Sequence, residues 1–96
     1  MNVLSLPTLD DLCGHVHKAL CDKNFLDPTQ SPLRRMVIHR RGRPCGLFFE
    51  VAGTRLMKSY AVWAGEENRI LFYDSSGERF AEVRLCDAPD PLRLAG

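Results

Sequence analysis

The basic side chains of this sequence are concentrated in one short stretch. Residues 34–43 hold five arginines and one histidine, and no acidic residue occurs between Asp27 and Glu50. Guanidinium groups bind phosphates through paired hydrogen bonds, and a two-stranded ribbon can enter the major groove of DNA. The candidate anion- or nucleic-acid-binding residues are therefore Arg40, Arg41 and Arg43.

Two features weaken the hypothesis of nucleic-acid binding. The arginine stretch lacks the interleaved aromatic residues on which single-strand binders stack bases. Residues 34–58 carry seven basic groups and one acid, whereas residues 66–90 carry three basic groups and seven acids. We expect these two halves to neutralise each other in part, because surface charge runs are usually solvated and internally paired. Nucleic-acid or anion binding is thus an alternative hypothesis and not the first.

The cysteines and histidines suggest a third hypothesis, a small enzyme. Cys45 follows a turn, where its thiol could pair with His39. Cys13, His17 and Cys21 have helical spacing, but that spacing matches no compact zinc motif and favours burial. The chain contains no GxSxG, HExxH or phosphate-binding glycine loop. We therefore predict no catalytic residues, no metal and no cofactor.

One helix and a series of strands must position these residues. Thr8 has the side chain of an N-cap, and apolar residues follow at spacings of three and four, which predicts a helix over Leu9–Asp22. From Arg34 the apolar period changes to two, and turn residues recur at short intervals. The predicted strands are about Arg34–Arg40, Cys45–Ala52, Arg55–Ala64, Arg69–Tyr73 and Glu78–Cys86.

These elements predict an α+β fold in which an N-terminal helix packs on a four- or five-stranded antiparallel β-meander. A partly closed β-roll with one helix is the alternative. At 96 residues the chain has the length of one domain, 1–96. Residues 87–96 contain two prolines and are expected to form a loosely attached tail. Whether the first strand pairs with the second alone or with the fifth as well stays open.

The middle strands are apolar on both faces, which is more than one helix can cover. Phe48 opposes an apolar row of its strand, and Trp63 and Tyr73 extend the pattern to the next strands. Large uncovered apolar surfaces usually mark binding sites, although a curled sheet or the chain ends could cover the second face instead. The predicted interaction face consists of Phe48, Met57, Trp63 and Tyr73.

The composition is that of an ordinary globular protein, with 45% hydrophobic and 26% charged residues and a net charge of +1. No apolar run approaches the roughly 20 residues that span a bilayer, and the first residues lack the pattern of a secretory leader. We therefore expect a cytoplasmic protein with free thiols and no membrane partner. The sequence does not determine the function. The favoured hypothesis is a small protein-interaction module that binds a protein partner or a second copy of itself, as a homodimer.

Overall fold

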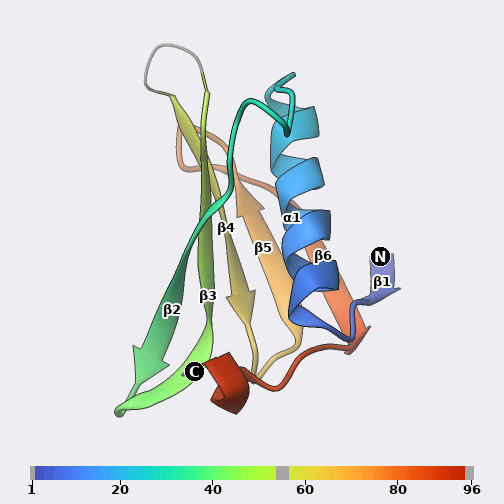
Figure 1. Ribbon diagram of the computed structural model, residues 1–96, viewed down its shortest axis with the longest axis vertical. Helices are drawn as coiled ribbons and strands as arrows, with labels where there is room; N and C mark the ends of the chain where they lie inside the picture. The colour runs from blue at the N-terminus through green and yellow to red at the C-terminus, as the bar shows by residue number, and fades with distance from the viewer. Residues whose placement is uncertain (1, 54–56, 95–96) are drawn as a thin grey trace.

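The computed structural model describes residues 2–53 and 57–94, and Figure 1 shows their arrangement. A single α-helix, α1 (Leu9–Lys23), lies against one face of a six-stranded sheet. The strands are β1 (Asn2–Ser5), β2 (Arg34–Arg40), β3 (Arg43–Ala52), β4 (Lys58–Ala64), β5 (Arg69–Tyr73) and β6 (Arg79–Asp87). A 3₁₀ helix, η2 (Pro91–Leu94), closes the described chain.

The predicted helix is confirmed to within one residue at its end. Thr8 Oγ1 accepts a hydrogen bond of 3.1 Å from the Asp11 amide, so an otherwise unpaired donor of the first turn is satisfied. Asp10 and Asp11 also place negative charge at the positive end of the helix dipole. The spacing of three and four residues puts one apolar stripe against the sheet. The fully buried residues of α1 are Leu12, Val16, Leu20 and Cys21.

The predicted antiparallel meander is also confirmed. The strand order is β1-β6-β5-β4-β3-β2, and each strand from β2 to β6 pairs antiparallel with its neighbour in sequence. Among the described residues β2 pairs only with β3 and forms one edge of the sheet, so the sheet is open and is not the partly closed roll of the alternative hypothesis. β1 lies at the other edge and pairs parallel to β6, and it was not among the predicted strands.

One predicted strand boundary lies outside the described residues, and the predicted tail packs more closely than expected. The proposed start of the third strand at Arg55 falls outside the described residues, and β4 begins at Lys58. The tail was expected to be loosely attached, but its described part packs on the domain. Ala88 and Leu94 contact the core, and η2 lies beside the start of β3 (Figure 1). The reason is that these apolar side chains cover core surface that α1 does not reach.

The core lies between α1 and one face of the sheet. Alternate residues of the central strands point toward the helix, as the period of two requires. The buried strand side chains on this face are Leu47, Phe49, Val51, Ser59, Ala61, Trp63, Ile70, Phe72, Val83 and Leu85. The intervening residues point to the opposite face of the sheet, which no helix of the described chain covers. That face is where the fold leaves apolar side chains partly exposed.

Candidate interaction face

The sheet surface opposite α1 is apolar at its centre, and we call it the open face. The strand registers align its side chains in rows, since Met36 pairs with Phe48, Phe48 with Val62 and Val62 with Leu71. Met36 is 67% exposed and the other three are half-buried. The open face comprises Met36, Ile38, Gly46, Phe48, Tyr60, Val62, Ala64, Leu71 and Tyr73. This apolar surface is contiguous across β2, β3, β4 and β5.

Three aromatic side chains form a ridge across the open face. The ring centroids of Phe48 and Tyr60 lie 5.6 Å apart, and those of Tyr60 and Tyr73 lie 5.0 Å apart with planes at 16°. The centroid spacing is close to the distance between neighbouring strands, so each ring stands beside the next. Stacked rings hold one another in fixed rotamers, which makes this aromatic ridge a preorganised contact surface.

A hollow of about 380 Å³ lies at the other end of the same strands. Gly46 and Ala64 face each other across β3 and β4 there, with Ile38 and Val62 beside them. Gly46 has to be glycine, because an added Cβ atom would collide with the main-chain carbonyl of Trp63. The close approach of the two backbones thus leaves the open face without side-chain volume at this point.

The structure divides the four predicted interaction residues. Phe48 and Tyr73 lie on the open face, and Met57, 53% exposed, lines a depression beside Phe48 and Tyr60. Placing Trp63 on an exposed surface was wrong, because it is fully buried. It pairs with Leu47 in the strand register and therefore shares the helix-covered face. A shift of one residue reverses the face of every side chain in a strand, so Tyr60 and Val62 take the exposed positions on β4.

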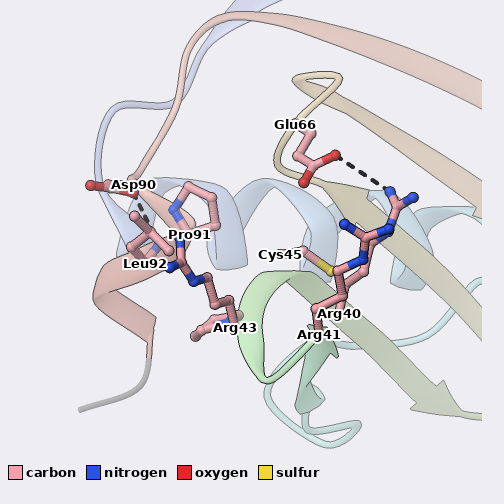
Figure 2. Close-up of a pocket in the computed structure, with 9 residues that line it drawn as sticks. Arg40, Arg41, Arg43, Cys45, Glu66, Asp90, Pro91 and Leu92 are labelled. Atoms are coloured by element: carbon pink, nitrogen blue, oxygen red, sulfur yellow. Dashed lines mark hydrogen bonds and ion pairs between the residues drawn. The ribbon is translucent and has the colours of Figure 1, made fainter.

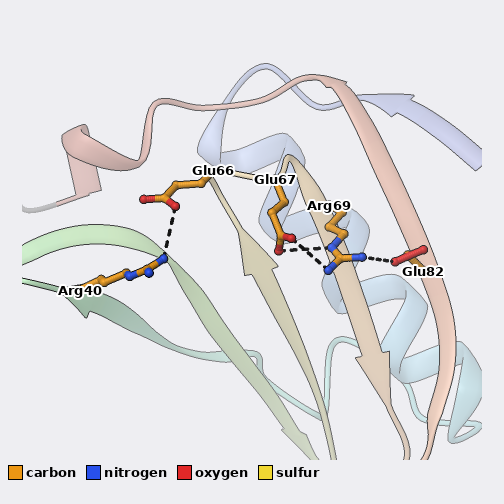
Figure 3. A network of polar contacts seen from close by, with 5 residues as sticks. All are labelled: Arg40, Glu66, Glu67, Arg69 and Glu82. Atoms are coloured by element: carbon orange, nitrogen blue, oxygen red, sulfur yellow. Dashed lines mark hydrogen bonds and ion pairs between the residues drawn. The ribbon is translucent and has the colours of Figure 1, made fainter.

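Two of the basic side chains at the margins of the open face, Arg69 and Lys58, are paired with carboxylates. Figure 3 shows the Arg69 guanidinium between two carboxylates, at 3.1 Å from Glu67 and 2.9 Å from Glu82. On the opposite margin, the Lys58 ammonium lies 3.7 Å from Glu50. These pairs are partly exposed and each contributes little stability, but they leave the apolar centre without an uncompensated charge.

The three candidate anion-binding arginines come together at the tip of the β2–β3 hairpin. Arg40, Arg41 and Arg43 line a pocket of about 810 Å³ with the η2 segment (Figure 2). Two carboxylates, Glu66 and Asp90, line it too, and Arg40 lies 3.5 Å from Glu66. The pocket therefore mixes both signs of charge, as the opposed charge runs in the sequence suggested.

The candidate Cys/His chemistry has little structural support. The Cys45 thiol donates to the Ile38 carbonyl at 3.4 Å, and among the described residues no hydrogen bond joins it to His39. His17 Nε2 lies 2.6 Å from the Ser31 carbonyl, and burial raises the pKa of the Cys21 thiol. Within residues 2–53 and 57–94, no group of three or more His, Cys, Asp or Glu side chains is placed to hold a metal ion.

No family model, curated protein or solved structure matches this chain. Among the described residues, no helix combines the length and the apolar character needed to cross a membrane. The large apolar side chains of the open face that sequence reasoning did not select are those of Met36, Ile38, Tyr60, Val62 and Leu71. The alternation of apolar residues on β4 and β5 indicated that Tyr60, Val62 and Leu71 share one face of the sheet. It did not indicate which face α1 covers.

Proposed function

We propose that this protein is a protein-interaction module that associates with a second copy of itself through the open face. The observation that carries the proposal is the aromatic ridge of Phe48, Tyr60 and Tyr73 within an apolar sheet surface that the helix leaves uncovered. Contiguous apolar patches of this kind are uncommon on monomers and usually mark contact sites. Aromatic residues and Met are also enriched at the centre of protein interfaces.

The size of the apolar part of the open face suits a weak homodimer. Four strands, β2 to β5, about 4.8 Å apart and each contributing about 20 Å of length, give a surface of roughly 400 Å² in projection. Two such surfaces in contact would bury on the order of 800 Å², which is the size of a weak interface that dissociates readily. Two sheets can pack face to face at a separation of about 10 Å, so the arrangement is the ordinary one of a β-sandwich.

The distribution of charge favours a protein partner over a polyanion. The open face has an apolar centre, and its marginal Arg69 and Lys58 are already paired with carboxylates of the same chain. A phosphate-binding surface would instead present arginine and lysine groups free to replace counterions. A second copy brings the same apolar centre, so that each face can cover the other.

The test is the mass of the protein in solution, measured by sedimentation equilibrium. The chain has a mass of 10.9 kDa, and we expect a dimer that dissociates on dilution. Phe48→Glu places a charge at the centre of the open face and should raise the dimer dissociation constant by about 30-fold or more, the effect of losing one hot-spot residue. Met36→Glu, at a more exposed position, should act in the same direction without disturbing the fold.

Phe25→Ser is the matched control. Phe25 is 97% exposed but lies in the turn after α1 and not on the sheet, so its replacement should leave the dissociation constant unchanged. Circular dichroism confirms that each variant is folded. A wild-type protein that stays monomeric at high micromolar concentration, or a control variant that dissociates as readily as Met36→Glu, contradicts the proposal.

A further inference from the structure

In the described part of the chain, the edge strand β2 has no neighbour on its outer side. The strand order ends at β2, which pairs with β3 alone (Figure 1). A strand in this position directs alternate N–H and C=O groups away from the sheet, where they can pair with another extended chain. β2 has seven residues, five of them exposed, and contains no proline. β1 at the other edge has only four residues, so β2 is the edge that can accept a full strand.

The side chains of β2 are basic at both ends of the strand and apolar at its centre. The sequence RRMVIHR sets three apolar residues between Arg34-Arg35 and His39-Arg40. Among the described residues, neither Arg34 nor Arg35 forms an ion pair, and the pair that Arg40 makes with Glu66 is exposed to solvent. Exposed pairs of this kind are weak. The positive charge of this edge is therefore available to an incoming strand.

The same pattern disfavours a second copy of β2 at the edge. An antiparallel pair centred on Val37 would set Arg34 opposite Arg40 and Arg35 opposite His39. A parallel pair in register would set each arginine opposite itself. Like charges directly opposite each other destabilise a strand pair, and charged side chains commonly protect edge strands in this way. A strand that does bind here must carry the opposite charge.

A shallow depression at the start of β2 offers a position for an acidic side chain. Its volume is about 300 Å³, and three cations and one carboxylate line it together with two apolar side chains. The carboxylate of Glu50 lies 3.7 Å from the Lys58 ammonium, so the depression keeps an excess of positive charge. The lining residues are Arg34, Arg35, Met36, Phe48, Glu50 and Lys58.

The two arginines at this end serve the two faces of the edge. Arg34 shares the open face with Met36, because residues two apart in a strand point the same way. Arg35 lies on the face of α1, where its Nη1 is 3.2 Å from the Cys13 Sγ atom. Successive side chains of an added strand also alternate between the faces. Two consecutive acidic residues of that strand can therefore each lie beside one arginine.

We propose that β2 binds an extended segment of a partner protein in which acidic residues flank a short apolar centre. The segment adds one strand to the sheet. Its main-chain hydrogen bonds with β2 supply affinity, and its carboxylates beside the arginines supply specificity. The apolar centre lies beside Met36, Val37 and Ile38. This site is the edge of the sheet, so the proposal goes beyond self-association through the open face and does not depend on it.

A synthetic peptide tests the charge requirement. The probe is a labelled, capped peptide, Glu-Glu-Val-Thr-Val-Glu-Glu, titrated by fluorescence anisotropy. We expect the wild-type protein to bind it. Arg34→Glu combined with Arg40→Glu reverses the charge at both ends of β2 and should weaken this binding by about tenfold or more. The same double variant should instead bind the basic peptide Lys-Lys-Val-Thr-Val-Lys-Lys more tightly than the wild type does.

A second peptide tests the strand pairing itself. N-methylation of the central Val-Thr-Val removes the backbone donors on both sides of the peptide and leaves its charges in place. Because pairing with β2 needs those donors, this peptide should bind about tenfold or more weakly than the unmodified one. Equal affinity of the two acidic peptides would mean that charge alone holds them, and it would overturn strand addition.

Arg79→Glu combined with Arg84→Glu is the matched control. Both residues are exposed on β6, which lies between β1 and β5, so the net charge changes by the same amount and the edge strand is unaltered. This variant should bind the acidic peptide within about threefold of the wild type at physiological salt, where distant surface charges are screened. Circular dichroism confirms that both double variants are folded.

Two further outcomes overturn the proposal. One is an equal loss of binding in the control and in the edge variant, and the other is a wild-type protein that does not bind the acidic peptide at millimolar concentration. Either outcome leaves self-association standing, because the mass in solution is a separate measurement.

Discussion

At the scale of single residues, the fold disfavours the protonated, charged form of His15. It lies half-buried on α1, with its ring 6.4 Å from that of Phe72 at an interplanar angle of 69°. Burial, assisted by the positive charge of Lys18, holds the pKa of His15 below its ordinary value of 6.5. The unfolded chain therefore takes up a proton at a higher pH than the folded chain does.

This difference predicts the direction of a pH effect. The contribution of His15 to stability is present above pH 6.5 and is lost as the pH falls through the lower pKa of the folded state. Urea midpoints measured from pH 7.5 to pH 5 should fall less steeply for His15→Gln than for the wild type. Lys18→Gln, which removes the second cause of the shift, should give an intermediate slope. A wild-type and a His15→Gln protein with parallel profiles would contradict the assignment.

At the scale of the elements, two exposed glycines allow the effect of helix propensity on stability to be compared with the effect of a positive φ angle. Gly14 lies inside α1 and Gly42 lies in the β2–β3 turn with φ +76°, and an added Cβ atom would meet nothing within 4 Å at either position. Gly14→Ala should stabilise the protein by about 1 kcal/mol, because alanine is the better helix former. Gly42→Ala should destabilise it by about 1 kcal/mol, since an L-residue is strained at positive φ.

Urea unfolding of the two glycine variants gives the comparison directly. Neither substitution creates a clash or buries a polar group, so the sign of each change reports the backbone alone. Each variant is the steric control for the other. A loss of stability in Gly14→Ala, or a gain in Gly42→Ala, would show that contacts outside the element determine the stability change of that variant.

The elements that local pattern specifies were predictable, and those that depend on distant partners were not. The Thr8 cap and the apolar stripe indicated α1 directly, and β5 was predicted with the bounds it has in the structure. β1 was missed because four residues carry too little pattern to show a strand whose partner, β6, lies at the other end of the chain. Trp63 was assigned to the wrong face because β4 carries apolar residues on both faces, so the sequence pattern does not distinguish them. Only the register of Trp63 with Leu47 decides which face α1 covers.

The candidate site shows the same division between pattern and packing. The excess of apolar strand surface over what one helix covers was visible in the alternation of β3, β4 and β5. The hollow at Gly46 was not, because it depends on the approach of Gly46 to the Trp63 carbonyl. The ridge likewise depends on three strands being in register.

At the scale of the whole molecule, the opposed charge runs determine how the protein should respond to polyanions. The net charge is +1, and the arginine-rich hairpin tip faces the acidic second half of the chain across one pocket (Figure 2). Arg40 is paired with Glu66, and Asp90 lines the same pocket as Arg41 and Arg43. Counterion release by such a surface is small, because the protein's own carboxylates already occupy part of the positive field.

We therefore expect weak retention on heparin, with elution below about 0.2 M salt. Glu66→Gln should strengthen retention, because it frees Arg40 from its ion pair. Glu78 is an exposed acid in the β5–β6 turn, and Glu78→Gln gives the same net charge as Glu66→Gln. Glu78→Gln should nevertheless change retention less. A larger change in the eluting salt concentration for Glu66→Gln than for Glu78→Gln indicates a local arginine site. Equal changes indicate a response to the total charge. The opposite outcome is a wild-type protein that elutes only at high salt and a double variant, Arg41→Gln with Arg43→Gln, that elutes at low salt. That outcome would make the hairpin tip a phosphate-binding surface in its own right.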